Sequence, residues 1–516
     1  MNLKDLQLSL PDEPSIKDSL ISTNPTKLRE ELEQLPYGNT LEALDQTTAK
    51  LALLNQTEIP TKLRFELLGC FSQPFEMFFN NLSNGETHNY SSTFQQSLDK
   101  LAELTTELGY GYKLALLSFS ENNPFRTQKL AERVYCAMTF VALDLLISFQ
   151  RHQTQSNLLW RDINQLYQYA RSKKLLGYSP TFDSELPLAN GIEALYLQIS
   201  VIAVSDPYQL VPEQIAHTWR YLSLFSECVK VDTLEQDSAP DSGFVINLSG
   251  HQKPQSYRWF RQGAQLLSMN LKPLNDQLET HLKQLQLDAN SKIPGLGETT
   301  SEFKNTLLSH FKNTWLQTSQ RQEERVPARK KVELTYSLRD VHCIASHATE
   351  SLTNIREKLS VLVGGQIKDE STSGACVVLQ NMPEYNLETG QLILLFTNNN
   401  DSIEMPRLAI VRWNTLDQSG RQIHLGVRYI PGQIYPISIK ADDKITVDTY
   451  PRNGLLLQEN SEPVDSWQVI AAPGLHNENR KLCMTFLGQH NEQYIISNTL
   501  INHSKYIQHF SITILS

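Results

Sequence analysis

The sequence predicts an α+β protein of several domains: an N-terminal all-α helical domain, an antiparallel β-barrel and a further C-terminal β domain. Over residues 25–319 apolar side chains recur every three or four positions, which is typical of amphipathic helices. After Gln320 the pattern changes to alternation with a period of two, typical of half-buried strands. A chain of 516 residues is long enough for about three domains with cores of their own.

The helical region is punctuated by Pro and Gly at the expected helix ends. Residues 1–24 mix Pro, Asp and Ser and are expected to be loosely ordered. The segment Asp232–Pro254 is expected to be a loop that holds a short strand. No fixed repeat period is found, so an array of helical hairpins and an orthogonal bundle both remain open. Helices are predicted over Thr40–Leu54, Pro60–Asn80, Ser92–Leu108, Gln128–Gln150, Leu158–Ser172, Gly191–Val204, Pro212–Lys230, Tyr257–Asn270 and Thr299–Gln317.

Aromatic residues in this region follow the same helical spacing, so they are expected in the core rather than around a cofactor. Trp160 and Tyr167 share one helix face, whereas Tyr169 lies off that face and is expected to be partly exposed. The other aromatic core candidates are Phe71, Phe75, Phe78 and Phe79.

The β region begins after a polar linker at residues 320–327. In Ile423–Tyr429 the apolar side chains fall on one face, and Asp417–Gly420 supplies a hairpin turn before it. Residues 320–435 are therefore expected to close into a small barrel, with an inserted helix near 341–362. Residues 436–516 are strand-like, and form either a second β domain or an extension of the barrel.

Composition excludes several classes of protein. A net charge of −10 and a pI near 5.8 argue against a general nucleic-acid binder. The six cysteines are scattered, which fits a reducing compartment. The N-terminus is too polar for a signal peptide, and Asp144 interrupts the longest apolar run, Cys136–Phe149. The sequence therefore predicts a cytoplasmic protein with no membrane span and no nucleic-acid partner.

The candidate ligand-binding residues lie in two short motifs. These are Arg325-Val-Pro-Ala-Arg329 and, forty residues later, Asp369-Glu-Ser-Thr-Ser-Gly374. Guanidinium groups bind phosphates through paired hydrogen bonds and stack on flat rings. An Asp or Ser can contact the edge of a base, and a Gly lets the backbone approach closely. Together they favour a ligand that carries phosphates and purines. Each motif alone is more often a solvated pair or an ordinary turn.

The order RxxxR followed by D/NxSxxG resembles the signature of the PilZ family of cyclic di-GMP receptors. The segments that follow the motifs, Leu387–Leu395, Leu408–Trp413 and Leu425–Tyr429, are similar to strands of that family. The resemblance covers roughly residues 320–435, about a fifth of the chain, and implies a PilZ-like β-barrel with cyclic di-GMP as its ligand.

The resemblance also implies roles for single residues. Arg325 and Arg329 would contact phosphate and the guanine O6/N7 edge, and Arg321 would supply a third guanidinium. Glu324 stands where many members carry a basic residue, a departure expected to weaken binding.

The second motif would hold the bases and keep the turn open. Asp369 would accept hydrogen bonds from guanine N–H groups, Ser371 would bond to the ligand, and Gly374 would keep the turn accessible.

The implied function is that of an effector without catalytic activity. Binding of cyclic di-GMP at the barrel would rearrange the helical output domain, and thereby regulate motility, type IV pili, biofilm or virulence. The helical domain would bind a protein partner, such as the pilus or motility machinery. The alternative is a scaffold or interaction protein whose barrel no longer binds ligand.

Enzymatic and metal chemistry find little support in the sequence. No Walker-type or GxGxxG loop and no nucleophile–base set is visible. His342, Cys343 and His347 lie close in sequence, but on the predicted helix His342 and Cys343 point apart, so no metal is expected.

Overall fold

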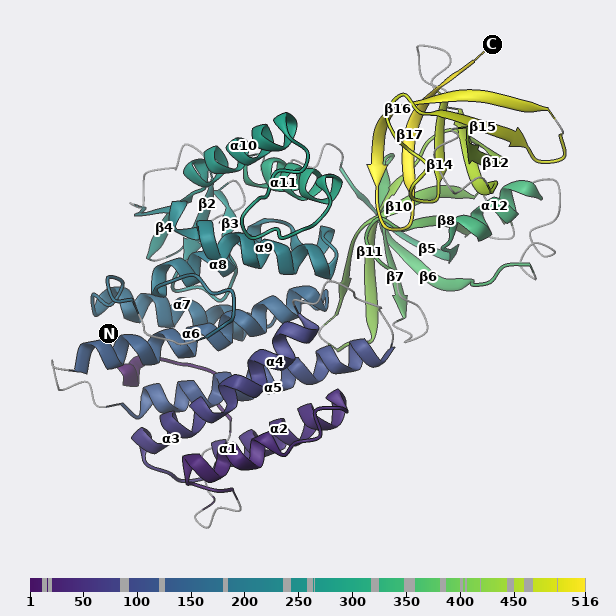
Figure 1. Ribbon diagram of the computed structural model, residues 1–516. Coiled ribbons are helices and arrows are strands. Elements are labelled where there is room, and N and C mark those ends of the chain that lie inside the picture. Colours follow the sequence, from purple (N-terminus) through teal and green to yellow (C-terminus); the bar gives the residue numbers. More distant parts are fainter. Residues whose placement is uncertain are drawn as a thin grey trace. The chain divides into compact units, whose positions relative to one another are not determined.

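The computed structural model divides the chain into two compact units, Met1–Gln320 and Arg321–Ser516 (Figure 1). The structure describes residues 1–11, 16, 21–83, 92–119, 126–179, 184–234, 243–257, 263, 265–316, 324–347, 358–380, 387–399, 402–403, 406–417, 419–442, 450–458, 467–489 and 491–515.

The first unit is helical over most of its length, as the periodicity predicts. Its helices are α1 (Pro25–Glu33), α2 (Thr40–Gln56), α3 (Thr61–Leu68), α4 (Ser72–Leu82), α5 (Ser92–Leu117), α6 (Thr127–Gln150), α7 (Asn157–Ser172), α8 (Ile192–Val204), α9 (Pro212–Phe225), α10 (Lys272–Leu287) and α11 (Ser301–Leu316). Short 3-10 helices among the described residues are η1 (Leu3–Asp5), η2 (Gly69–Phe71), η4 (Pro207–Gln209) and η5 (Ser226–Cys228).

Side-chain caps fix several of these helix starts. The Asn24 side chain accepts hydrogen bonds from the backbone of Thr26 and Lys27, and Pro25 occupies the first position of α1. Asn39 caps α2 and Ser156 caps α7 in the same way. Such caps satisfy amides that the helix itself leaves unpaired.

Helix α6 forms the centre of the core, and its side chains are buried on nearly every face. The ring of Phe140 stacks on Tyr112 of α5 at 5.0 Å and meets Phe75 of α4 edge-on at 5.2 Å. Phe71, Phe78 and Phe79 are likewise buried, which confirms the predicted aromatic core. None of the helices in the described part of the chain is both long and apolar enough to cross a membrane.

A small antiparallel sheet follows the helices, with the order β1 (Lys230–Thr233), β4 (Leu266–Asn270), β2 (Phe244–Asn247) and β3 (Gln255–Ser256). The short strand predicted near residue 244 is confirmed. The helix predicted over Tyr257–Asn270 is wrong at residues 266–270, which pair with β1 and β2. The apolar residues Leu266, Leu267 and Met269 fit the spacing of a helix as well as that of a strand. Pairing with strands distant in sequence selects the strand.

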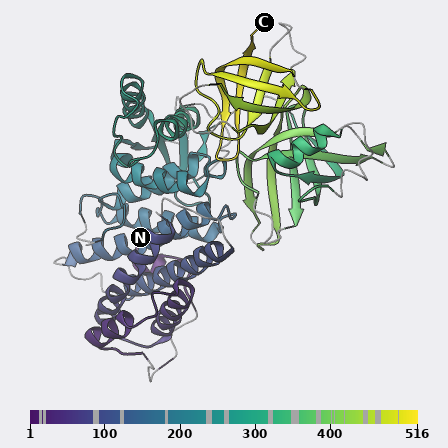
Figure 2. The same cartoon turned by 45° about the vertical axis from the view of Figure 1, so that its right-hand side comes forward.

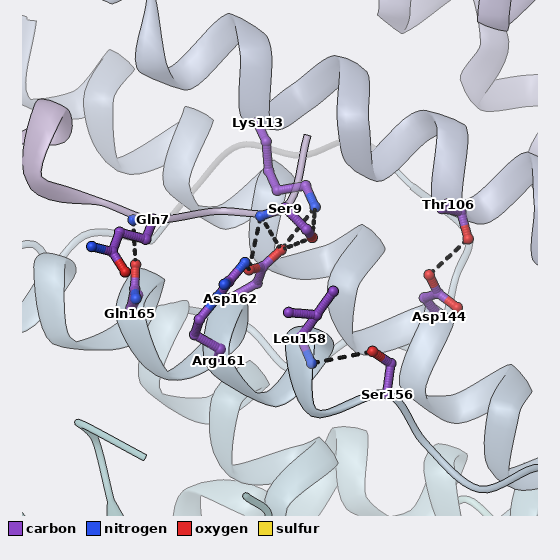
Figure 3. A network of polar contacts seen from close by, with 10 residues as sticks. All are labelled: Gln7, Ser9, Thr106, Lys113, Asp144, Ser156, Leu158, Arg161, Asp162 and Gln165. Carbon is purple, nitrogen blue, oxygen red and sulfur yellow. Dashed lines mark hydrogen bonds and ion pairs between the residues drawn. The ribbon is translucent and has the colours of Figure 1, made fainter. Parts of the chain in front are cut away.

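The first eleven residues are docked on the first unit rather than loose, contrary to the sequence-based prediction. Leu3, Leu6 and Leu8 are buried. The backbone amide of Ser9 donates to both carboxylate oxygens of Asp162 at 3.0 and 3.1 Å, and its hydroxyl also bonds to Asp162 (Figure 3). A composition rich in polar residues does not reveal that a buried carboxylate elsewhere holds the backbone.

Asp144 on α6 is a second buried acid in the same region (Figure 3). Burial raises its pKa to about 6, although a hydrogen bond from the Thr106 hydroxyl at 2.8 Å opposes the shift. The folded state therefore binds more protons than the unfolded state between roughly pH 4 and 6, so this group lowers stability as the pH rises through that range.

Asp144→Asn is expected to stabilise the protein at neutral pH, because it removes the cost of a buried charge. The gain in the free energy of unfolding should be about 2 kcal/mol at pH 7.5, and about 1 kcal/mol smaller at pH 5. Urea denaturation of the full chain at both pH values measures the difference. An equal effect at both pH values would contradict an ionised Asp144 at neutral pH.

The second unit begins with a sheet that closes on itself. Its strands are β5 (Val326–Thr335), β6 (Val363–Glu370), β7 (Gly374–Gln380), β8 (Leu392–Asn399), β9 (Ser402–Ile403), β10 (Arg407–Leu416) and β11 (Gln422–Tyr429). The order is β10-β11-β7-β6-β5-β8-β9, and an added pairing of β8 with β10 joins the ends. We refer to β5–β11 as the first barrel. The hairpin predicted at Asp417–Gly420 is present, with Gly420 donating to the Asp417 carbonyl at 3.0 Å.

The inserted helix is shorter than predicted. Helix α12 spans Leu338–Ser346, residues 348–357 lie outside the described residues, and residues 358–362 are not helical. The reason is visible at Asp340, whose carboxylate accepts hydrogen bonds from the Ser360 amide at 3.3 Å and hydroxyl at 2.6 Å. These bonds draw the chain back beside the start of α12 and lead it into β6.

The C-terminal segment forms a closed barrel of its own, so it is a further β domain rather than an extension of the first barrel (Figure 2). We call it the second barrel. Its strands are β12 (Gln433–Ala441), β13 (Arg452–Gln458), β14 (Trp467–Ala471), β15 (Lys481–Phe486), β16 (Glu492–His503) and β17 (Gln508–Ile514).

The two barrels have the same topology. Around the second barrel the strands follow the order first, second, third, sixth, fifth, fourth. The first barrel has this order too when β5, β6, β7, β8, β10 and β11 are counted in sequence. An apolar cluster joins the barrels, with Val341 and Ile344 of α12 between Leu394 and Leu455. The second unit thus contains two barrels of one topology that share a core.

Candidate functional site

The two sequence motifs lie on neighbouring strands of the first barrel. Strands β5 and β6 pair antiparallel, with Val326 opposite Glu370 and Pro327 opposite Asp369. The register shifts between Pro327 and Lys330, which places a β-bulge at Ala328-Arg329. Although α12 lengthens the connection, the first motif lies directly beside the second.

Arg325 and Asp369 form an ion pair. The Arg325 Nη1 donates to the Asp369 Oδ1 at 2.7 Å, and the two side chains are 22% and 28% exposed. Water screens a pair this exposed, so its net contribution to stability is at most about 1 kcal/mol. Either group can therefore exchange its partner for a ligand at little cost.

Arg329 is exposed at the bulge of β5, and no hydrogen bond or ion pair of its side chain occurs among the described residues. Its guanidinium is thus available to an anion. Arg321, the third predicted guanidinium, lies outside the described residues.

The turn between β6 and β7 carries Ser371 and Gly374. The Ser371 amide donates to the Gly374 carbonyl at 2.8 Å, and its hydroxyl lies 3.3 Å from the same oxygen. A Cβ on Gly374 would lie only 2.1 Å from the carbonyl oxygen of Val427 on β11. Because Gly374 has no side chain, β7 and β11 can approach each other closely. This packing role is additional to the open turn predicted from sequence.

Glu370, between Asp369 and Ser371, joins the motif to three other strands. Its Oε1 accepts from Arg407 of β10 and from the Tyr429 hydroxyl of β11, both at 2.8 Å. Its Oε2 accepts from Lys330 of β5 at 3.2 Å. Burial raises the pKa of Glu370, but the Tyr429 and Lys330 hydrogen bonds and nearby positive charges outweigh burial and leave it lowered.

The sequence does not predict this network. The motif accepts any residue at the position of Glu370, and Arg407 and Tyr429 come from strands far along the chain. The only available signal was the alternation that places Tyr429 on a barrel face. The network fixes the strand ends that carry the motif residues, so it positions the site.

The two histidines considered for metal binding contact backbone carbonyl oxygens. His347 Nδ1 lies 2.8 Å from the Cys343 carbonyl oxygen, and His342 Nε2 lies 3.2 Å from the Ile437 carbonyl oxygen on β12. In the described ranges no group of three His, Cys, Asp or Glu side chains is placed to hold a metal ion.

Comparison with known proteins gives two family matches. Residues 26–236 match the model of the N-terminal domain of the cyclic-di-GMP receptor FimW, and residues 244–356 match its middle PilZ domain. Together they cover more than half of the chain. The second match contains Arg325 and Arg329 and ends before Asp369.

A curated relative agrees with these matches. The cyclic-di-GMP receptor FimW of Pseudomonas aeruginosa is 23% identical over 349 residues, which cover 65% of this chain and 56% of that protein. The chain therefore spans about half the length of this relative. Among solved structures, the Bacillus subtilis inhibitor of motility MotI/DgrA aligns at 12% identity over 37% of this chain and 90% of its own, with a TM-score of 0.11, too low to bear on the fold.

Proposed function

Since the chain belongs to the family of PilZ-domain cyclic di-GMP receptors, we propose that it binds cyclic di-GMP at the two motifs of the first barrel. The register of β5 against β6 carries this proposal, because it brings Arg325 into contact with Asp369 and places Arg329 on the strand beside the second motif. The proposed ligand contacts are Arg325, Arg329, Asp369, Ser371 and Gly374, with Arg321 from the preceding segment.

The exchange of partners at Arg325 gives a physical route for binding. A phosphate of the ligand offers the guanidinium paired charge-assisted hydrogen bonds in place of one contact with Asp369. Asp369 is then released to accept hydrogen bonds from guanine N–H groups. Arg329 contributes a second guanidinium for phosphate or for the guanine O6/N7 edge.

The output of binding is proposed to pass to the first, helical unit. That unit would bind a protein partner, and the bound ligand would alter its availability. Motility, type IV pili, biofilm and virulence are the proposed processes, with the pilus or motility machinery as a candidate partner. The named family is a receptor, so the protein is proposed to act in the cytoplasm by binding rather than by catalysis.

Calorimetric titration of cyclic di-GMP into the full chain tests the proposal. Saturable binding is expected for the unchanged protein. Arg329→Ala should weaken binding at least about tenfold, because a lost charge-assisted hydrogen bond costs about 1.5–3 kcal/mol. The double variant Arg325→Ala/Arg329→Ala should show no measurable binding while its circular dichroism is unchanged.

Arg339→Ala is a matched control, since it removes an exposed arginine from α12 rather than from the motif. It should bind as the unchanged protein does. Absence of binding by the unchanged protein up to about millimolar ligand would reject the proposal and favour a scaffold whose barrel binds no nucleotide.

A further inference from the structure

A cleft of about 490 Å³ lies between the motif turn and the second barrel. Its size falls within the range of small-molecule sites. From the first barrel it is lined by Thr372 and Ser373 of the turn, by Arg428 and Tyr429 of β11, and by Ile430 and Pro431. From the second barrel it is lined by Gln468 of β14, Ile501 of β16 and His509 of β17.

Hydrogen bonds hold the first-barrel wall of this cleft in place, and an apolar cluster joins the first barrel to the second. The Tyr429 amide donates to the Ser373 carbonyl at 2.9 Å, which holds the motif turn against the end of β11. The Ile430 amide donates to the Leu408 carbonyl, also at 2.9 Å. Ile430, Leu408 and Ile470 all belong to the apolar cluster that joins the barrels. The cleft is thus a built feature of the second unit.

Arg428 gives the cleft its charge. It is exposed, and no hydrogen bond or ion pair of its guanidinium is found among the described residues. None of the described residues lining the cleft is acidic. A guanidinium in a concave site whose lining carries no carboxylate favours an anion, and its planar fork suits phosphate or a guanine edge.

The opposite wall is uncharged at neutral pH and presents two polar side chains, Gln468 and His509. Burial, and after it the charge of Arg428, lowers the pKa of His509 to about 4. The neutral His509 Nε2 lies 2.7 Å from the Oε1 of Gln468 and donates to it. Hydrogen-bonding side chains with no net charge can face a nucleotide base without repelling the phosphates beside it.

We propose that the second barrel forms the far wall of the nucleotide site, and that Arg428 binds a phosphate or guanine edge of the cyclic purine dinucleotide. This inference rests on the proposed function, since the motif turn is shared by both parts of the site. It gives the second barrel a role in binding although its first strand, β12, carries no RxxxR motif. The ligand would then hold the two barrels together.

The test is calorimetric titration of cyclic di-GMP into full-length variants of both walls. Arg428→Ala should weaken binding about tenfold, because one guanidinium contact is lost. Ile501→Glu places a negative charge in the cleft and should weaken binding by at least about tenfold. Ile501 is 42% exposed, so this change leaves the barrel core intact.

Two matched controls separate the cleft from general charge effects. Arg421→Ala removes an exposed arginine at the β10–β11 turn, and Leu487→Glu adds an acid at a 54% exposed leucine of the second barrel, both outside the cleft. Both should bind as the unchanged protein does.

Arg428→Lys tests the shape of the group, because lysine keeps the charge without the planar fork. It should bind several-fold more weakly than the unchanged protein.

The outcomes distinguish the two proposals. If the unchanged protein binds and Arg428→Ala and Ile501→Glu bind within about twofold of it, the inference about the second barrel is overturned while the motif site stands. If the controls lose as much affinity as the cleft variants, the inference is also overturned. If the unchanged protein does not bind, both proposals fall.

Discussion

Gly374→Ala is expected to lower the free energy of unfolding by about 3 kcal/mol or more and to weaken cyclic di-GMP binding at least about tenfold. The added Cβ would lie 2.1 Å from the Val427 carbonyl oxygen. That oxygen belongs to the backbone of a neighbouring strand, so no side-chain rotation relieves the clash. Strands β7 and β11 must separate, which strains or breaks the ladder around the pair Gly374–Arg428.

The loss of affinity follows from the same displacement. The separation moves the turn that carries Ser371 away from Tyr429, whose amide bonds to Ser373 and whose hydroxyl bonds to Glu370. The geometry on both sides of the proposed ligand changes although no ligand contact is deleted. Urea denaturation followed by circular dichroism, and calorimetric titration, measure the two effects.

Gly364→Ala on β6 is the matched control, because nothing lies within 4 Å of its added Cβ. It should leave affinity unchanged and should raise the free energy of unfolding by about 0.4–1 kcal/mol rather than lower it, because alanine restricts the unfolded chain more than glycine does. If Gly374→Ala unfolds at the same urea concentration as the unchanged protein, the close approach of β7 and β11 is not a constraint on this turn.

The features predicted from sequence are those that local pattern determines. Alternation places Ile423, Leu425, Val427 and Tyr429 on one face, and in the structure all four pack in the core of the first barrel. Trp160 and Tyr167 are buried, as helical spacing predicts. The periodicity of apolar residues within a single helix or strand is enough to predict which side chains are buried.

The features missed depend on contacts between distant segments. Tyr169 was expected to be partly exposed but is fully buried, because α7 packs against both α6 and α8 and so has more than one covered face. The ion pair of Arg325 with Asp369 depends on the register of β5 against β6. Local sequence patterns identify the residues of that site, but they do not predict the strand register that brings those residues together.

The cleft between the two barrels is even less predictable from local sequence. Arg428 lies in a segment that resembles a family strand, but nothing in that segment marks it as a ligand residue. Gln468 and His509 belong to a barrel without the motifs. Their proximity follows from two closed barrels joined by an apolar cluster. Barrel closure and the packing of one barrel on another are non-local, so no local signal predicts this wall of the site.

Asp162→Ala is expected to lower the free energy of unfolding by about 3–5 kcal/mol. Lys113 and Asp162 are 3% and 0% exposed and pair at 2.9 Å, so the variant leaves a buried ammonium without its ion-pair partner (Figure 3). Burial already lowers the pKa of Lys113 despite the opposing charge of Asp162. Loss of the carboxylate also leaves the Ser9 amide without its acceptor.

Urea denaturation measures this loss, and hydrogen exchange of residues 3–9 follows the docking of the N-terminal segment. Glu31→Ala breaks a pair whose partners, Lys50 and Glu31, are 31% and 41% exposed. It should cost less than about 1 kcal/mol, because water already solvates both groups. An equal loss for the two variants would show that the Lys113–Asp162 pair is solvated like a surface pair.

The double variant Lys113→Met/Asp162→Leu separates the cost of an unpaired charge from the value of the pair itself. Apolar side chains of similar size remove both charges, and such replacements are often neutral or stabilising. The double variant is therefore expected to recover most of the stability lost by Asp162→Ala. Protection of residues 3–9 should not recover, because Ser9 still lacks the carboxylate that accepts its amide and hydroxyl. The buried pair would then act chiefly to hold the N-terminal segment on α7, rather than to stabilise the helical core.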